Sequence, residues 1–251
     1  MCCFSRPVET VADTNIFARG GKSGRQYLVY SMKFAAGEDL AMILPIPTPK
    51  GSPEDAVKFI NLEKYAAFFE DLKKGFPEPP LPRGPKLGDK KDDTPKSKDL
   101  PVVEVGNFVA SFVPAIKDFD RLDKQFRLPD GVWGKLPQYK DFGFAVFKLK
   151  KPEKKDGTQK VHPMAFDFPR AEKDLLFFPT VHIHDGSVPA KAAFDHALFC
   201  QTNEAPARWE ESPGHASSFV KVKETQGILE PDAHVYRRLM KGTFDNKDVG
   251  V

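Results

Sequence analysis

The chain has 251 residues, of which 40% are hydrophobic and 29% are charged, a balance typical of a globular protein with a buried core. Its 38 basic and 35 acidic residues nearly cancel, so there is no basic footprint for a nucleic-acid partner. No run approaches the roughly 18 apolar residues of a membrane span, and no signal-peptide pattern opens the chain. Only three cysteines occur. We therefore expect a cytoplasmic protein with reduced thiols and no membrane anchor.

The residue types favour β-structure. The 22 phenylalanines and 23 prolines indicate short strands and ordered loops instead of long helices. The predicted class is α+β, with a predominantly antiparallel β-sheet and a few short peripheral helices. We expect one domain over residues 1–251, interrupted by a disordered loop at about 77–99, where prolines, lysines and aspartates leave no apolar face to pack.

The first third of the chain predicts three strands and a helix. Residues 15–19 and 26–34 have strand character, and the glycines between them are typical of a hairpin loop. Residues 39–49 form an almost wholly apolar run, which predicts a strand buried on both faces. A helix is expected over residues 62–74, because large apolar side chains recur there at spacings of three and four. We expect this stripe to pack in the core.

The remainder of the chain alternates strands and short helical turns. Further strands are predicted at residues 102–113, 142–149 and 219–223, a helical turn at 119–126, either strand or helix at 190–201, and a terminal helix at 233–241. Residues 161–186 contain two apolar runs around a polar break, which predicts a central β-hairpin. Three of the six histidines lie on it, namely His162, His182 and His184.

The histidines of this hairpin form the first candidate site. Because strand side chains alternate, we expect His182 and His184 to share one face, with Val181 and Ile183 on the other. A His-x-His pair on a strand is typical of zinc and iron sites, so we predict a metal bound by His162, His182 and His184. Other candidates for the third ligand are Asp185, His196 and Cys200. The alternative is that the histidines hydrogen-bond to neighbouring strands or face water.

The N-terminus is the second candidate site. Removal of Met1 would leave the Cys2 thiol beside a free α-amine, which can accept the thiol proton, so one residue supplies nucleophile and base. Arg19 is a plausible electrostatic partner for the thiolate or for a bound carboxylate. The alternatives are a buried structural thiol or a lipid-modified Cys2-Cys3 pair. Cys200, four residues after His196, is interpreted as structural.

Two resemblances follow from the N-terminal residues. Cys2-Cys3-Phe4, Ile16 to Arg19 and Leu44-Pro45-Ile46-Pro47 resemble an uncharacterised bacterial family with a cysteine-rich start and a Leu-Pro-x-Pro strand end, and that resemblance implies no activity. Cys2 with Phe17-Ala18-Arg19 is similar to the start of N-terminal-nucleophile amide hydrolases of the bile-salt-hydrolase type. That resemblance implies catalysis by Cys2 and a supporting role for Arg19. The chain has Gly20-Gly21-Lys22-Ser23 where that family has Asn-x-x-Asp.

The leading hypothesis from the sequence is therefore a hydrolase of a small-molecule amide that uses Cys2. The alternatives are a metal-binding or small-molecule-binding module built on the histidines, and a structural or interaction protein without catalysis. The sequence indicates neither the substrate nor the oligomeric state.

Overall fold

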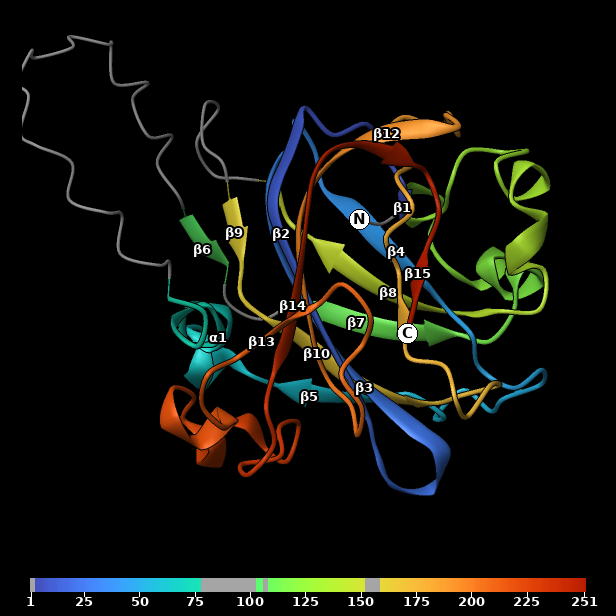
Figure 1. Ribbon diagram of the computed structural model, residues 1–251. Coiled ribbons are helices and arrows are strands. Elements are labelled where there is room, and N and C mark those ends of the chain that lie inside the picture. The colour runs from blue at the N-terminus through green and yellow to red at the C-terminus, as the bar shows by residue number, and fades with distance from the viewer. Residues whose placement is uncertain (1–2, 78–102, 106–107, 152–158) are drawn as a thin grey trace, which may run out of the picture.

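The computed structural model describes residues 3–77, 103–105, 108–151 and 159–251. Within these residues two large β-sheets pack against each other, with one short α-helix and several turns of 3-10 helix on the outside (Figure 1). Most neighbouring strands are antiparallel, which confirms the predicted α+β class. No helix in this part of the chain is both long and apolar enough to cross a bilayer.

The smaller sheet has four antiparallel strands in the order β1 (Cys3–Phe4), β4 (Leu40–Ile46), β8 (Gly143–Leu149) and β7 (Val109–Val113). Every residue of β4 is buried, as its continuous apolar run predicts. Met42 and Leu44 pack toward the larger sheet, whereas Ala41 and Ile43 pack into a separate cluster on the opposite face. β4 is therefore covered on both sides.

The larger sheet contains nine strands among the described residues. Its main path runs β13 (Glu210–Glu211), β14 (Tyr236–Asp245), β12 (Lys191–Gln201), β2 (Thr10–Gly20), β3 (Arg25–Ala35), β10 (Met164–Pro169) and β5 (Lys58–Asn61), and β9 (Gln159–Val161) joins β3 to β6 (Val103–Val105). β12 lies parallel to β2, and β6 lies parallel to β9. The predicted glycine-rich hairpin is confirmed, since Gly20 of β2 pairs with Gln26 of β3.

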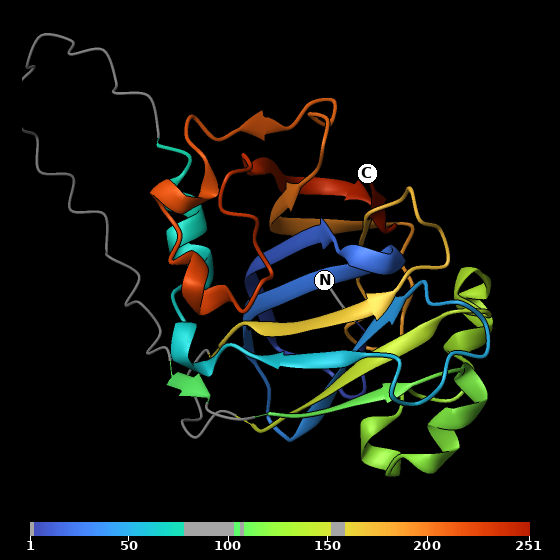
Figure 2. The same ribbon diagram turned by 90° about the horizontal axis from the view of Figure 1, so that it is seen from below.

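Helical segments cover the outer faces of the two sheets. The predicted helix is confirmed as η2 (Glu63–Tyr65) followed by α1 (Phe68–Lys74), and its apolar stripe is buried against Phe17 and Phe199 of the larger sheet. Figures 1 and 2 show α1 beside the orange turns of residues 216–225, and the green turns near residues 116–139 at the far side. The 3-10 turns are η1 (Lys22–Gly24), η3 (Ile116–Arg121), η4 (Lys124–Phe126), η5 (Trp133–Lys135), η6 (Pro137–Tyr139), η7 (Ala216–Ser218) and η8 (Val222–Thr225).

The prediction of a central hairpin over residues 161–186 is wrong. Its first run forms β10, which pairs with β3 and β5. Its second run contains only the short β11 (Phe177–Phe178), which pairs with the C-terminal β15 (Val249–Gly250). The two runs separate because β3 and β5 occupy both edges of β10, so no edge is left for a hairpin partner.

The terminal helix predicted at residues 233–241 is also wrong, because that segment belongs to β14. Ten residues of β14 pair in unbroken antiparallel register with β12, from Tyr236 opposite Cys200 to Asp245 opposite Lys191. This long ladder outweighs the weak helical preference of the local sequence. The strand predicted at 219–223 is wrong as well, since that stretch contains a bend and part of η8. The predicted loop at 77–99 lies, apart from Pro77, outside the described residues.

Candidate functional site

The segment of residues 180–184 is held extended by side chains near the C-terminus. One Asp248 oxygen accepts hydrogen bonds from the Thr180 and Val181 backbone amides at 2.8 and 3.0 Å. The Asn246 side chain accepts from the His182 amide at 2.7 Å and donates to the His182 carbonyl at 3.0 Å. The Phe4 backbone amide also donates to the Ile183 carbonyl at 3.1 Å, so the segment keeps strand-like alternation with only an isolated bridge to β1.

That alternation places His182 and His184 on the same side, as the sequence predicts. Their rings stack with centroids 5.4 Å apart and planes at 21°. Val181 and Ile183 point the other way, into the cluster that covers the outer face of the smaller sheet. The predicted division of the four side chains is therefore confirmed, although the hairpin that motivated it is absent.

His196, from β12, completes a cluster of three histidines. Its ring stacks on His182 at 5.2 Å and 29°, and Phe194 contacts both rings at 4.2 and 5.0 Å. Phe4 closes the other end by meeting His184 edge-on at 5.8 Å. We call His182, His184 and His196 the histidine cluster. His196 reaches it through the pairing of β12, which no local sequence signal predicts.

Burial keeps the histidine cluster neutral. Removal from water lowers the pKa of His182 to about 2, far below its ordinary value, because the charged imidazolium loses its solvation. The same cause lowers the pKa values of His184 and His196, and Asp185 opposes the shift only at His184. Near pH 7 the three rings are therefore uncharged aromatic groups.

The arrangement of the rings gives no support to the predicted metal site. Imidazole lone pairs lie in the plane of the ring, whereas these rings present their faces to one another. Across the described part of the chain, no group of three or more His, Cys, Asp or Glu side chains is placed to hold a metal ion. His162 is not a member, because its ring stacks instead on Phe108 at 4.6 Å. The predicted zinc or iron ligands His162, His182 and His184 are thus not brought together as one set.

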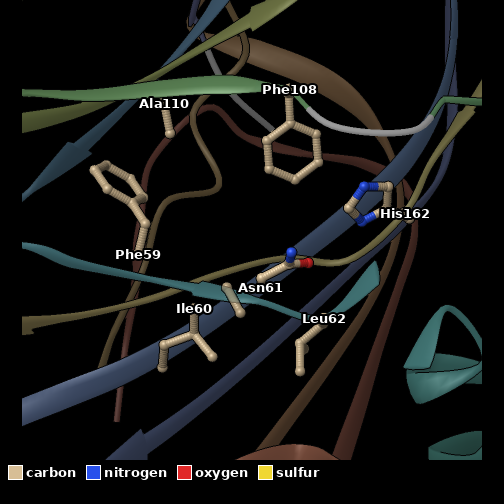
Figure 3. Close-up of a pocket in the computed structure, with 8 residues that line it drawn as sticks. Phe59, Ile60, Asn61, Leu62, Phe108, Ala110 and His162 are labelled. Carbon is tan, nitrogen blue, oxygen red and sulfur yellow. The ribbon is translucent and has the colours of Figure 1, made fainter. Parts of the chain in front are cut away.

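His162 lines a pocket of about 260 Å³ (Figure 3). The pocket lies between the end strands of the two sheets, since Phe59 and Asn61 come from β5 and Ala110 comes from β7. Among the described residues, its lining is Phe59, Ile60, Asn61, Leu62, Phe108, Ala110, His162 and Ala165. Six of these eight residues are apolar, and a combination of apolar side chains with a few polar groups is typical of small-molecule sites. We call it the His162 pocket.

Sequence reasoning missed the other members of this pocket. Phe59 and Asn61 lie about fifty residues from Phe108, and the two segments belong to different sheets. The pocket exists only because the ends of the two sheets meet. No spacing of residues within either segment predicts this contact between the two sheets.

Arg19 has a structural role in the described residues. Its Nε donates to the Ile228 carbonyl at 2.6 Å, one terminal nitrogen donates to the Gly227 carbonyl at 2.6 Å, and the other forms an ion pair with Glu230. All three guanidinium nitrogens are therefore occupied by the loop at residues 227–230. Arg19 anchors this loop to the end of β2.

The described cysteines are buried. Cys3 pairs in β1 with Ile43 of the smaller sheet, whereas Arg19 belongs to the larger sheet. Burial raises the pKa of the Cys200 thiol to about 12, so it stays protonated at neutral pH. This agrees with the structural interpretation of Cys200. Cys2 lies outside the described residues, so its proposed nucleophilic role stays a prediction.

No protein-family model matches the chain, and no curated protein matches its sequence. Solved structures do match its fold. The crystal structure of baculovirus P35 covers 99% of this chain and 98% of its own, with 13% identity and a TM-score of 0.52.

Two further structures of P35 are also similar. A mutated baculovirus P35 after caspase cleavage has 14% identity, covers 95% of this chain and 99% of that chain, and gives a TM-score of 0.49. The caspase-8/P35 complex has 15% identity, covers 95% of both chains and gives a TM-score of 0.45. At 13% identity, the similarity to the first of these structures shows a shared fold. This chain shares the fold of baculovirus P35 over nearly its whole length.

Proposed function

We propose that this chain binds a protein partner and that the partner is a protease of the caspase class. The observation that carries the proposal is the fold likeness to baculovirus P35, which extends over 99% of this chain and 98% of that chain. P35 itself is solved in complex with caspase-8 and, as a mutated form, after caspase cleavage. We take the caspase class of the proposed partner from P35.

Exposed apolar side chains support a protein partner. Three large hydrophobic residues are exposed in the described part of the chain, namely Phe59, Val109 and Leu239. Phe59 and Val109 lie on β5 and β7, the end strands of the two sheets, and Leu239 lies on β14, beyond which only the two residues of β13 pair. An open sheet edge with apolar side chains accepts an extended segment of another protein.

The chemistry of the described residues also favours binding over catalysis. Cys3 and Cys200 are buried, and the raised pKa of Cys200 keeps its thiol protonated. The three stacked histidines are neutral and enclosed by Phe4 and Phe194. Neither group combines an activated nucleophile with an accessible base, the arrangement on which nucleophilic catalysis depends.

Titration of active caspases with the purified chain tests this proposal. Caspase-8 is the first enzyme to assay, with hydrolysis of a fluorogenic peptide as the readout. We expect hydrolysis to fall as the chain is added and the two proteins to elute together on size exclusion. Intact mass reports whether the chain is cut, and fragment masses report where.

A caspase whose catalytic cysteine has been alkylated beforehand is the matched control. A chain that binds at the active site should fail to elute with the blocked enzyme. Unchanged hydrolysis by every caspase at excess chain, with no complex and no cleavage, would contradict the proposal.

A further inference from the structure

The His162 pocket has braced walls. Phe59 and Phe108 both contact the fully buried ring of Phe147, at 5.7 and 5.5 Å, and Phe59 also meets Phe166 at 6.0 Å. Because the Phe147 ring supports both sides, closing the pocket would require displacement of packed aromatic side chains. The space is therefore preformed.

Small side chains keep the space open. Ala110 of β7 and Ala165 of β10 line the pocket where larger residues would fill it. Phe59 at the rim is 38% exposed, which connects the cavity of about 260 Å³ with solvent. This volume is just below the usual range for ligand pockets, about 300 to 1,000 Å³, and suits a compact molecule.

Two of the described lining residues, Asn61 and His162, have polar side chains. None of the described lining residues is Asp, Glu, Lys or Arg, so an ionic ligand would gain no ion pair from them. The Asn61 side-chain oxygen accepts a hydrogen bond from the Glu63 backbone amide at 2.8 Å. The Asn61 amide nitrogen has no hydrogen-bond partner among the described residues and is left to donate to a ligand.

The aromatic residues define the shape of the ligand. Figure 3 shows Phe59 and Phe108 reaching the pocket from separate segments, with the Asn61 amide near His162. His162 is buried and extends the aromatic wall, because it stacks on Phe108 at 4.6 Å and 30°. A planar ring inserted beside these side chains gains offset-stacked or edge-to-face contacts.

We propose that the His162 pocket binds small neutral aromatic molecules that carry a hydrogen-bond acceptor, with the ring among Phe59, Phe108 and His162 and the acceptor at the Asn61 amide nitrogen. This site is separate from the histidine cluster and does not depend on a caspase partner. It assigns a small-molecule ligand to residues that the sequence alone does not bring together.

Acetophenone and ethylbenzene are suitable probes, since they have similar size and only acetophenone carries a carbonyl oxygen. Titration of isotope-labelled protein by NMR should shift the amide resonances of residues 59–62, 110 and 165. Acetophenone should bind about 2- to 10-fold more tightly, as expected for one additional hydrogen bond.

Two substitutions on one strand test the location. Ala110→Trp should fill the pocket and weaken binding of both probes at least tenfold. Val109→Trp is the matched control, because Val109 is 61% exposed and does not line the pocket. It should leave both affinities within twofold. Far-UV circular dichroism establishes that each variant is folded.

A third substitution tests the hydrogen bond. Asn61→Asp keeps an oxygen that accepts from the Glu63 amide but removes the amide donor. Acetophenone should then lose its advantage over ethylbenzene. Resonance shifts outside the pocket, equal affinities of the two Trp variants, or a carbonyl preference that survives Asn61→Asp would each overturn the proposal.

Discussion

The histidine cluster and the His162 pocket place the same residue type in two different settings. His162, His182 and His196 are all buried, with 8%, 5% and 1% of their surfaces exposed. In the cluster the rings pack against one another and against Phe194, whereas His162 faces a cavity beside Phe108. Burial alone therefore does not distinguish the two settings. The partners of each ring do, because His182 and His196 stack on each other, whereas His162 stacks on Phe108.

The largest expected effect is acid sensitivity caused by the histidine cluster. Burial holds the folded-state pKa values of His182 and His196 below the ordinary 6.5, so at acid pH the unfolded chain binds more protons than the folded chain. The stabilisation that the neutral rings provide is present in full above about pH 6.5. It decreases as the pH falls below that value. Each ring contributes about 1.4 kcal/mol per pH unit, so the free energy of unfolding should drop by about 5 kcal/mol near pH 4.5.

His196→Phe isolates this effect, because phenylalanine retains the aromatic packing without a titrating group. Urea unfolding from pH 7 to pH 4.5 should show a shallower loss of stability, by about 1.4 kcal/mol per pH unit, than in the native sequence. The raised pKa of Asp248 acts in the opposite direction, but it is present in both proteins and cancels in the comparison. Parallel stability curves would show that the cluster does not control acid sensitivity.

The second effect concerns the contacts that hold the cluster in place. Asp248→Ala removes the acceptor for Thr180, Val181 and the Tyr139 hydroxyl, which donates to it at 2.5 Å. Three donors then lose their partner, and the free energy of unfolding should fall by about 3 kcal/mol. Thermal and urea unfolding measure the loss. The amide resonances of the His162 pocket should keep their positions, because none of these three partners of Asp248 lines it.

Asp245→Ala is the matched control from the same segment. Asp245 is exposed and pairs with Lys247 at 3.6 Å, so its removal should cost less than about 1 kcal/mol. A loss as large as that of Asp248→Ala would mean that the segment tolerates no substitution. The hydrogen bonds of Asp248 would then not be the cause.

The smallest expected effect is a difference in reactivity among the three cysteine thiols. Cys2 and Cys3 directly precede Phe4, which contacts the histidine cluster at His184. If Met1 is removed, Cys2 should react with iodoacetamide several-fold faster than Cys3 or Cys200 near pH 7, since its own amine can accept the proton. Cys3 is buried, and the pKa of Cys200 is about 12. Peptide mass analysis of the alkylated protein compares the three rates.

One residue inserted before Cys2 removes the amine and leaves the fold unchanged. The rate of Cys2 should then fall toward that of an ordinary exposed thiol. Equal rates with and without the insertion, or a chain that retains Met1, would contradict the nucleophile hypothesis.

The sequence by itself predicted the features that depend on neighbouring residues. The glycines at 20–24 indicated the turn between β2 and β3, and the apolar run of β4 indicated a strand buried on both faces. The spacing of Tyr65, Phe68 and Leu72 indicated a buried helical face. Alternation alone put His182 and His184 on the same side. Each of these signals operates within about ten residues, where backbone geometry fixes which side chains lie together.

Only the tertiary structure decided which segments meet. β14 is a strand because it pairs with β12, about forty residues earlier in the chain, and residues 180–184 are extended because Asn246 and Asp248 supply their hydrogen bonds. The same long-range pairing brings His196 to His182 and separates both from His162. Strand partners are determined by the total surface that the sheets bury. A local sequence pattern carries no information about a partner so far away in the sequence.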